Sequence, residues 1–405
     1  MARKLDLNDI GTRTLAIHAG EYPDQATRAS SPNLVMSSTF VLDEPLGFSA
    51  HDLTPDSPYI YTRWANPTVR TLEEKLAALE GAEACVCFAS GMAATAALFF
   101  NLLQAGDHLV MTDVGYAGAA ELARDGLTRL GIEVTAVNAS EPENVAEALR
   151  PNTRLVYLES PCNPIMRLTD IEMVAALAHR HGAKVGVDNT FATPVGTQPI
   201  ALGADFVVHS LTKYLCGHGD AVGGAVLGNV EDMRVLNTEQ AIHHGGILSP
   251  FNAWLIARGV ATLPVRMQAH EQNAMAVARF LENHERVERV VYPGLASHPQ
   301  ADLARRQMKN FSGMLSFQVR GGRSAGESLA KRMAEELNVV HYAVSLGHHR
   351  TLVTWLGTDD LLASSFRLKG EAVEAYRAYA GDGIFRLSVG LEDPHDICRD
   401  LDAVL

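Results

Sequence analysis

The stretch Val207–Val222, which reads VVHSLTKYLCGHGDAV, decides how this 405-residue chain is interpreted. Together with Phe206 it opens with a short apolar run of the length and β-branched character of a buried strand. The run ends in His209–Tyr214, where small hydroxyl residues precede Lys213. Because lysine is usually a solvated surface charge, a lysine at the end of a predicted buried strand calls for a chemical explanation.

The residues near Lys213 supply that explanation. Ser210 and Thr212 lie just before it, and Asp188 follows another apolar run, Ala183–Val187. Pyridoxal phosphate requires such a set: a lysine amine forms a Schiff base with its aldehyde, a carboxylate keeps the pyridine nitrogen protonated, and hydroxyls bind the phosphate. The sequence therefore predicts a pyridoxal phosphate site around Lys213.

The composition is that of an ordinary globular protein. Apolar residues make up 47% of the chain and charged residues 20%, which favours two or three domains with ample core. The net charge of −13 comes from scattered acids, so we expect no nucleic-acid partner. No apolar stretch is long enough to span a membrane, and the segment Met1–Asp6 lacks the apolar core of an export signal. A cytoplasmic location is the expectation.

Cysteine and histidine spacing gives no sign of a metal site. The five cysteines show no paired spacing, so we expect them to be reduced. The histidine pairs at positions 243–244 and 348–349 point their side chains apart on a regular element, and no HExxH motif is present. No GxGxxG motif follows a predicted strand, which disfavours a nicotinamide cofactor.

Strands and helices alternate regularly between residues 66 and 210. A helix is predicted to begin at Asn66–Thr68 and to stop at Gly81. The predicted strands that follow are Ala84–Phe88, His108–Thr112, Ile132–Val137, Arg154–Glu159, Ala183–Val187 and Phe206–His209, and the predicted helices between them are Gly91–Leu103, Ala119–Leu130, Asn144–Leu149 and Ile171–His181. Because these strands are apolar throughout, we expect a parallel sheet covered on both faces, with ligands beyond the carboxyl ends of its strands.

Three loops after predicted strands carry further candidates. The sequence Ser90-Gly91-Met92 opens a helix whose free amides suit a phosphate. Tyr116 is able to stack on a planar ring and donate a proton, and Asn163, between two prolines, is able to reach a ring oxygen. Each has an ordinary structural alternative, which is a plain turn or a half-buried tyrosine.

Beyond about residue 250 the pattern changes to shorter strands. A long helix is predicted over Ala261–Asn283 and strands over Met314–Val319 and Leu352–Trp355, which indicates a smaller α+β domain. We therefore expect an arm over residues 1–65, a cofactor domain over 66–255 and a C-terminal domain over 256–405. Arg386 lies in an apolar strand, where it needs a fixed anion; a substrate carboxylate and a structural salt bridge are equally open.

Together these motifs resemble the cysteine/methionine-metabolism family of pyridoxal phosphate enzymes, which includes cystathionine γ-synthase, cystathionine γ-lyase, methionine γ-lyase and O-acetylhomoserine sulfhydrylase. The resemblance covers residues 14 to 400 and is carried by Tyr61–Thr68, Ala89–Met92, Glu159–Pro164, Val187–Thr190, His209–Tyr214, Ser345–Gly347 and Arg386–Glu392. It implies the fold-type I, aspartate-aminotransferase-like α/β architecture. It also implies a homotetramer of two dimers with shared active sites, the arm reaching the neighbouring subunit.

The resemblance implies a role for each candidate. Lys213 would carry the cofactor aldehyde and move protons, and Asp188 would pair with the pyridine nitrogen. Tyr116 would stack on the ring and act as general acid, although a phenol, whose ordinary pKa is about 10, needs a neighbouring cation for this. The phosphate would be held by Ser90, Gly91, Met92, Ser210 and Thr212, together with Tyr61 and Arg63 from the adjacent subunit. The substrate would contact Asn163, Val344, Ser345 and Arg386.

The substrate side favours elimination at Cγ. Family members that act on cystathionine typically have a glutamate before the Ser-Leu-Gly motif, whereas Val344 resembles methionine γ-lyase. Two departures stand out: Gly118 replaces the cysteine typical of methionine γ-lyase, and residues 348–350 replace the family's usual Gly-x-Glu stretch. We predict a γ-eliminating lyase acting on methionine or a related sulfur amino acid. The alternatives are γ-replacement, cystathionine γ-lyase activity, or a binding protein that keeps the fold without catalysis.

Overall fold

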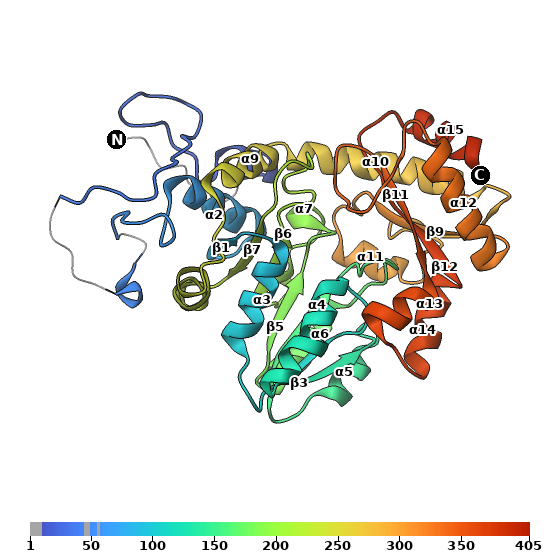
Figure 1. Ribbon diagram of the computed structural model, residues 1–405, viewed down its shortest axis with the longest axis horizontal. Helices are drawn as coiled ribbons and strands as arrows, with labels where there is room; N and C mark the ends of the chain where they lie inside the picture. The colour runs from blue at the N-terminus through green and yellow to red at the C-terminus, as the bar shows by residue number, and fades with distance from the viewer. Residues whose placement is uncertain (1–9, 44–48, 55–56) are drawn as a thin grey trace.

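The computed structural model describes residues 10–43, 49–54 and 57–405. Within these residues a seven-stranded sheet forms the larger unit and a five-stranded sheet forms the smaller one. Figure 1 shows the N-terminal segment leaving the larger unit as an extended arm, on the side opposite the smaller unit. The predicted start, Met1–Asp6, and part of the loop over residues 43–58 lie outside the described residues.

The larger sheet has the strand order β1-β7-β6-β5-β4-β2-β3. Its strands are β1 (Ala84–Phe88), β2 (His108–Thr112), β3 (Glu133–Val137), β4 (Thr153–Glu159), β5 (Lys184–Asp188), β6 (Phe206–Ser210) and β7 (Gly224–Gly228). Strands β2 to β6 pair in parallel, whereas β7 is antiparallel to β1 and β6. The predicted parallel pairing is confirmed for β2 to β6, and the sheet as a whole is mostly parallel. Strand β7 was not predicted, because a five-residue run bounded by glycines carries a weak strand signal.

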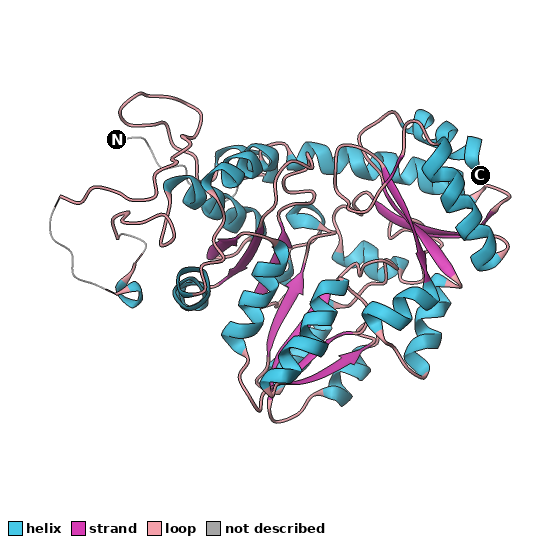
Figure 2. Cartoon of the chain, viewed as in Figure 1, coloured by secondary structure: helices cyan, strands magenta, loops and turns pink. Residues whose placement is uncertain are grey.

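Helices cover both faces of this sheet, as Figure 2 shows. Leu109 and Phe206 point to the face under α3 (Gly91–Leu102) and α4 (Ala117–Glu121), while Val110 points to the opposite face. That opposite face is covered by α2 (Pro67–Glu80), α5 (Pro142–Ala148), α6 (Ile171–Arg180) and α9 (Pro250–Val260). The predicted helix over 119–130 ends earlier as an α-helix and continues as a π-helical turn and a 3-10 turn, Leu122–Gly126 and Leu127–Leu130.

The smaller unit has the strand order β10-β11-β12-β9-β8. Its strands are β8 (Val287–Val291), β9 (Met314–Val319), β10 (His341–Tyr342), β11 (Leu352–Gly357) and β12 (Gly383–Ser388), and its sheet packs on α12 (Gly322–Glu336) and α15 (Pro394–Val404). Helix α10 (Leu263–Glu282) joins the units, because Met267 packs in the core of the larger one and Leu281 in that of the smaller one. The domain boundary at residues 255 and 256 stays a prediction.

Short elements complete the described chain. They are α1 (Thr12–His18), α7 (Thr193–Gly196), α8 (Val230–Leu236), α11 (Ala301–Gln307), α13 (Thr358–Leu361) and α14 (Glu371–Ala380), the 3-10 turns Ala50–Asp52 and Pro199–Leu202, and the π-helical turns Asn237–His243 and Leu362–Phe366. In the described segments we find no helix long and apolar enough to cross a membrane. All five cysteines are free.

Candidate functional site

The carboxyl ends of three parallel strands meet at one edge of the larger sheet. Glu159 at the end of β4 pairs with Asp188 at the end of β5, and Asp188 pairs with Val208 near the end of β6. Lys213 follows β6 in a tight turn, in which its backbone amide donates to the carbonyl of Ser210 at 3.2 Å. The edge therefore brings together two carboxyl groups and the lysine that the sequence singled out.

The amine of Lys213 faces the smaller unit. Its Nζ donates a hydrogen bond to Ser345 Oγ at 3.1 Å. Burial lowers the pKa of Lys213, and the nearby positive charge of Arg386 lowers it further. Both effects favour the neutral amine, which is the form that attacks an aldehyde or takes a proton.

Arg386 projects from β12 toward the same space. Its Nη1 donates to Asn163 Oδ1 at 2.9 Å and its Nη2 donates to the backbone oxygen of Ser345 at 3.2 Å. Burial lowers the pKa of Arg386, and Glu159 opposes that effect. Among the described residues no carboxylate lies within ion-pair distance of this guanidinium, so the structure contains no salt bridge of the kind left open by the sequence. A guanidinium held by neutral oxygens keeps its charge for an anionic ligand.

Glu159 is a site residue to which the sequence analysis gave no role. Its Oε2 accepts a hydrogen bond from the backbone amide of Tyr116, and its Oε1 accepts one from the backbone amide of Asn163, both at 2.7 Å. Burial, and then the charge of Asp188, raise the pKa of Glu159 well above its ordinary value. One buried carboxyl thus fixes two loops of the site. An acid ending an apolar strand, the signal that identified Asp188, was available here too.

The carboxyl group of Asp188 is held in a buried setting. Its Oδ1 accepts the backbone amide of Thr190 at 3.0 Å. Burial raises the pKa of Asp188, while the bonds from Thr190 and the charge of His209 oppose the rise. His209 in turn contacts Glu80, Nε2 to Oε2, at 3.1 Å. A buried carboxylate of this kind gains from a cationic partner such as a protonated pyridine nitrogen.

The start of α3 forms a cradle for an anion. Ser90 Oγ accepts the amide of Ala93 at 3.1 Å, whereas within the described chain the amides of Gly91 and Met92 have no protein acceptor. A Cβ on Gly91 would lie 2.8 Å from the Cβ of Ser210, so glycine allows the Ser210 hydroxyl to lie against the helix start. Two free amides, a hydroxyl and the helix dipole suit a phosphate. The residues present fit pyridoxal phosphate.

Thr212 contributes differently from Ser210. Its Oγ1 accepts the amide of Gly223 at 3.1 Å and donates to the carbonyl of the same residue at 3.3 Å. Thr212 therefore fixes the loop after Lys213. Its contact with phosphate stays a prediction.

The remaining predicted site residues are more exposed. Tyr116 precedes α4 with 49% of its surface exposed, and Val344, next to Ser345, is 76% exposed. Arg63 donates to the carbonyl of Ile242 at 2.7 Å, and its guanidinium carbon lies 5.6 Å from the ring centre of Tyr61. In the described part of the chain no hydrogen bond or ion pair joins these two arm residues to Lys213. Their role in an adjacent subunit stays a prediction.

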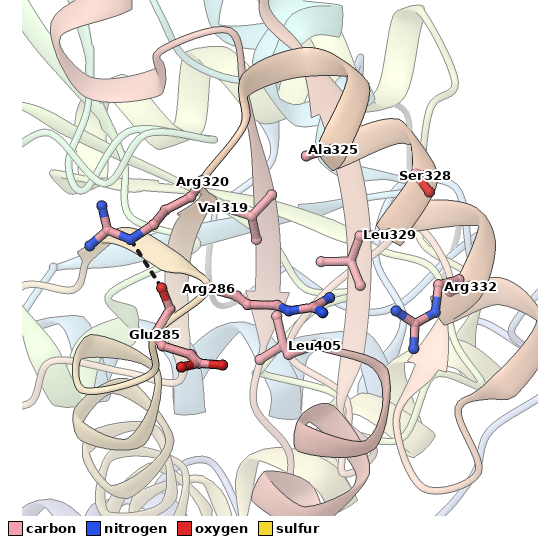
Figure 3. Close-up of a pocket in the computed structure, with 9 residues that line it drawn as sticks. All are labelled: Glu285, Arg286, Val319, Arg320, Ala325, Ser328, Leu329, Arg332 and Leu405. Carbon is pink, nitrogen blue, oxygen red and sulfur yellow. Dashed lines mark hydrogen bonds between the residues drawn. The ribbon is translucent and has the colours of Figure 1, made fainter.

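A separate cavity of about 420 Å³ lies in the smaller unit. Figure 3 shows Arg286 and Arg332 projecting toward one another over an apolar floor that includes Leu329 and Leu405. Arg320 also lines the cavity, and its Nε donates to the carbonyl of Glu285 at 3.0 Å. None of the predicted site residues lines this cavity, so it is distinct from the candidate site.

Comparison with known proteins identifies the family. The family model described as Cys/Met metabolism PLP-dependent enzyme matches residues 13–405. The chain is 42% identical over 403 residues to an L-methionine gamma-lyase of Porphyromonas gingivalis, with 98% of each protein covered. It is 40% identical over 395 residues to a cystathionine gamma-synthase of Mycobacterium bovis, with 98% of this chain and 97% of that protein covered.

A solved structure agrees with this result. The crystal structure of metB from Corynebacterium glutamicum matches with a TM-score of 0.88 at 38% sequence identity, over 99% of both chains. The predicted fold-type I architecture and the predicted cofactor are thereby confirmed. The chain belongs to the Cys/Met-metabolism family of PLP-dependent enzymes.

Proposed function

We propose that this enzyme catalyses γ-elimination from L-methionine or a related sulfur amino acid. In the balanced reaction, methionine and water give 2-oxobutanoate, ammonia and methanethiol. One observation carries the proposal. The guanidinium of Arg386 bonds only neutral oxygens, one of them on Ser345, and the residue next to Ser345 is Val344, whose apolar side chain is exposed. Enclosing a distal ammonium against valine without a partner would cost affinity, so an uncharged thioether is favoured.

Substrate binding is assigned to the groups that surround Arg386. Its guanidinium would bind the α-carboxylate, because its present acceptors are neutral and leave its charge uncompensated. Asn163 Oδ1 and the backbone oxygen of Ser345 hold the guanidinium plane. Glu159 accepts the backbone amide of Asn163, so this buried carboxyl group fixes the residue that holds Arg386.

Proton movement is assigned to Lys213 and Tyr116. When bound, pyridoxal phosphate supplies an electron sink for the charge that develops at Cα. Lys213 Nζ would take the Cα proton, give that proton up again and, once neutral, take a Cβ proton; its lowered pKa favours the neutral form that each uptake requires. The Tyr116 hydroxyl would protonate the departing sulfur. Asp188 would keep the pyridine nitrogen protonated, and the phosphate would be held by Ser90, Gly91, Met92, Ser210 and Thr212.

The second candidate function is γ-replacement, in which a thiol captures the substrate skeleton. The similarity to the Mycobacterium bovis cystathionine gamma-synthase, at 40% identity, supports it. The two candidates share the groups around Lys213 and differ in what reaches the Val344 side of the site.

We also propose that the enzyme works as a cytoplasmic homotetramer in which the arm completes the site of an adjacent subunit. Supporting this, the arm exposes apolar side chains that a partner would cover: Met36 is 65% exposed and Val41 is 96% exposed. Arg63 and Tyr61 lie on the same arm and would reach the phosphate of the adjacent subunit.

The first experiment supplies methionine, cystathionine and O-acetylhomoserine separately to the purified enzyme, each with and without an added thiol. Quantifying 2-oxobutanoate separates the two reactions. Rapid 2-oxobutanoate formation from methionine alone is the expected result. Thioether formed from O-acetylhomoserine plus thiol, with no ketoacid from methionine, would move the enzyme to γ-replacement.

A further inference from the structure

The geometry points to His348 as a positioning residue for Lys213, acting through the hydroxyl of Ser345. A hydrogen-bonded series runs from Lys213 Nζ to Ser345 Oγ and on to the imidazole of His348. Residues 348–350 are where this chain departs from its family's usual pattern, and the sequence left their role open. The inference rests on the proposed function of Lys213 in proton transfer.

The series is built on an unusual backbone conformation at Ser345. Its φ is 101°, in the left-handed region that residues with a Cβ rarely adopt. This conformation lets the hydroxyl lie 3.1 Å from Lys213 Nζ and 3.4 Å from His348 Nε2. The backbone oxygen of the same residue accepts from Arg386. Ser345 therefore contacts Lys213, His348 and Arg386.

The imidazole of His348 has a defined position. It lies over Gly219, where an added Cβ would come within 2.6 Å of the imidazole Cε1. Gly219 has a φ of 72°, so glycine is favoured there on two grounds. The adjacent loop is tied down as well, because the amide of His349 donates to the carbonyl of Gly217 at 3.0 Å.

Burial and the neighbouring positive charges favour the neutral form of the His348 imidazole. Burial lowers the pKa of His348 most, followed by the charges of Lys213, His349 and Arg350, while Asp220 opposes them. The His218 ring also belongs to this cluster, with its centre 5.9 Å from that of His349. In the neutral tautomer that carries its hydrogen on Nδ1, the Nε2 of His348 accepts a hydrogen bond from the Ser345 hydroxyl.

The state of His348 decides which way the Ser345 hydroxyl points. Toward a neutral imidazole the hydroxyl donates, so its oxygen accepts from Lys213 and the lone pair of the amine stays free for substrate. A protonated imidazole donates to the same oxygen, and the hydroxyl hydrogen then turns toward Lys213 and occupies that lone pair. Protonation of His348 thus removes the base, which gives activity an acidic limb.

The test compares His348→Gln, which keeps hydrogen-bonding capacity without titrating, and His348→Leu with the wild-type holoenzyme. His341→Gln is the matched control, because His341 is exposed on β10. The acidic limb of kcat/KM should be absent in His348→Gln. In His348→Leu, kcat should fall about tenfold while KM changes less than about twofold. The pH midpoint of the visible cofactor absorbance should move in both variants and stay in place in the control.

A double-variant cycle makes the test decisive. In a Ser345→Ala background, His348→Gln should have no further effect on the absorbance midpoint, because the connection is already broken. Additive effects, or an unchanged midpoint in His348→Gln, would overturn the inference. The absorbance titration needs no substrate, so its outcome is independent of whether methionine is turned over. If His348→Leu does not fold, His348→Gln and the cycle still decide.

Discussion

At the strand-end edge of the larger sheet, Lys213 and Arg386 have defined partners within the chain, whereas the arm that carries Tyr61 and Arg63 exposes much of its apolar surface. The two regions differ in what holds their side chains in place. The edge is fixed by contacts between residues far apart in the sequence, such as the bond from Arg386 to Asn163. The arm has Val41 at 96% exposure and offers that surface to a partner.

This contrast predicts two kinds of variant. Changes at the edge should act within the subunit that carries them, because that subunit supplies every contact they disturb. Changes in the arm should act on the subunit next to it.

Replacing Lys213 with alanine should have the largest effect. The variant should lose kcat/KM by roughly 10³-fold or more, because both the cofactor attachment and the proton-transferring amine are removed. Steady-state kinetics and the visible spectrum of the purified protein measure the loss. Lys331→Ala, on the exposed side of α12, is the control and should match the wild type. Turnover within about tenfold of the wild type would refute the assignment of Lys213.

Replacing Arg386 should mainly weaken substrate binding. Arg386→Ala is expected to raise KM by about a hundredfold, since a charge-assisted hydrogen bond contributes about 1.5–3 kcal/mol. Arg386→Lys keeps the charge but not the two-pronged geometry, and should fall between the alanine variant and the wild type. Arg320→Ala, in the cavity of Figure 3, serves as the arginine control. An unchanged KM in Arg386→Ala would mean that the carboxylate binds elsewhere.

The sequence predicted much of the edge because its signals are local. Apolar runs that end in Asp188 and in the turn before Lys213 identify strand ends, and parallel strands bring such ends together. The role of Glu159 was missed although it ends the same kind of run, because its partners are the backbone amides of Tyr116 and Asn163. A hydrogen bond from a backbone amide to a side chain does not depend on the type of the residue that donates it, so the sequence does not reveal it.

Other features depended on long-range packing that no local pattern encodes. The antiparallel strand β7 was missed because Gly224–Gly228 is short and bounded by glycines. The contact between Ser345 and His348 requires a positive φ at a serine, for which residue type gives no warning. The proposed role of Tyr61 and Arg63 is in the site of a neighbouring subunit, so contacts within a single chain do not reveal it.

A subunit-mixing experiment tests the arm directly. Arg63→Ala should lower activity by weakening the phosphate site of the neighbour, whereas Lys213→Ala inactivates its own site. If the sites are shared, refolding equal amounts of the two variants together gives mixed dimers with one intact site each. About a quarter of all sites should then regain activity. Mixing either variant with itself provides the control, and a mixture with no more than half the activity of Arg63→Ala alone would place Arg63 in its own subunit's site or in none.

The smallest expected effect comes from Gly118, which lies against the ring of Tyr116. A Cβ at this position would lie 2.8 Å from Tyr116 Cε1 and 3.1 Å from Met92 Sδ, so Gly118→Ala forces the tyrosine ring to shift. Because Tyr116 is half exposed, its ring is able to move at little cost in stability, and the misplaced hydroxyl is expected to lower kcat by roughly fivefold if it is the proton donor. Gly11→Ala is the control, because an added Cβ there meets nothing within 4 Å. Gly182 also has open space around it but is unsuitable, because its φ is positive. The ratio of kcat for methionine to kcat for O-acetylhomoserine should fall in Gly118→Ala, because only the poorer leaving group, the thiolate, depends strongly on the proton from Tyr116. Equal losses on both substrates would show that Tyr116 positions the cofactor and does not protonate the leaving group.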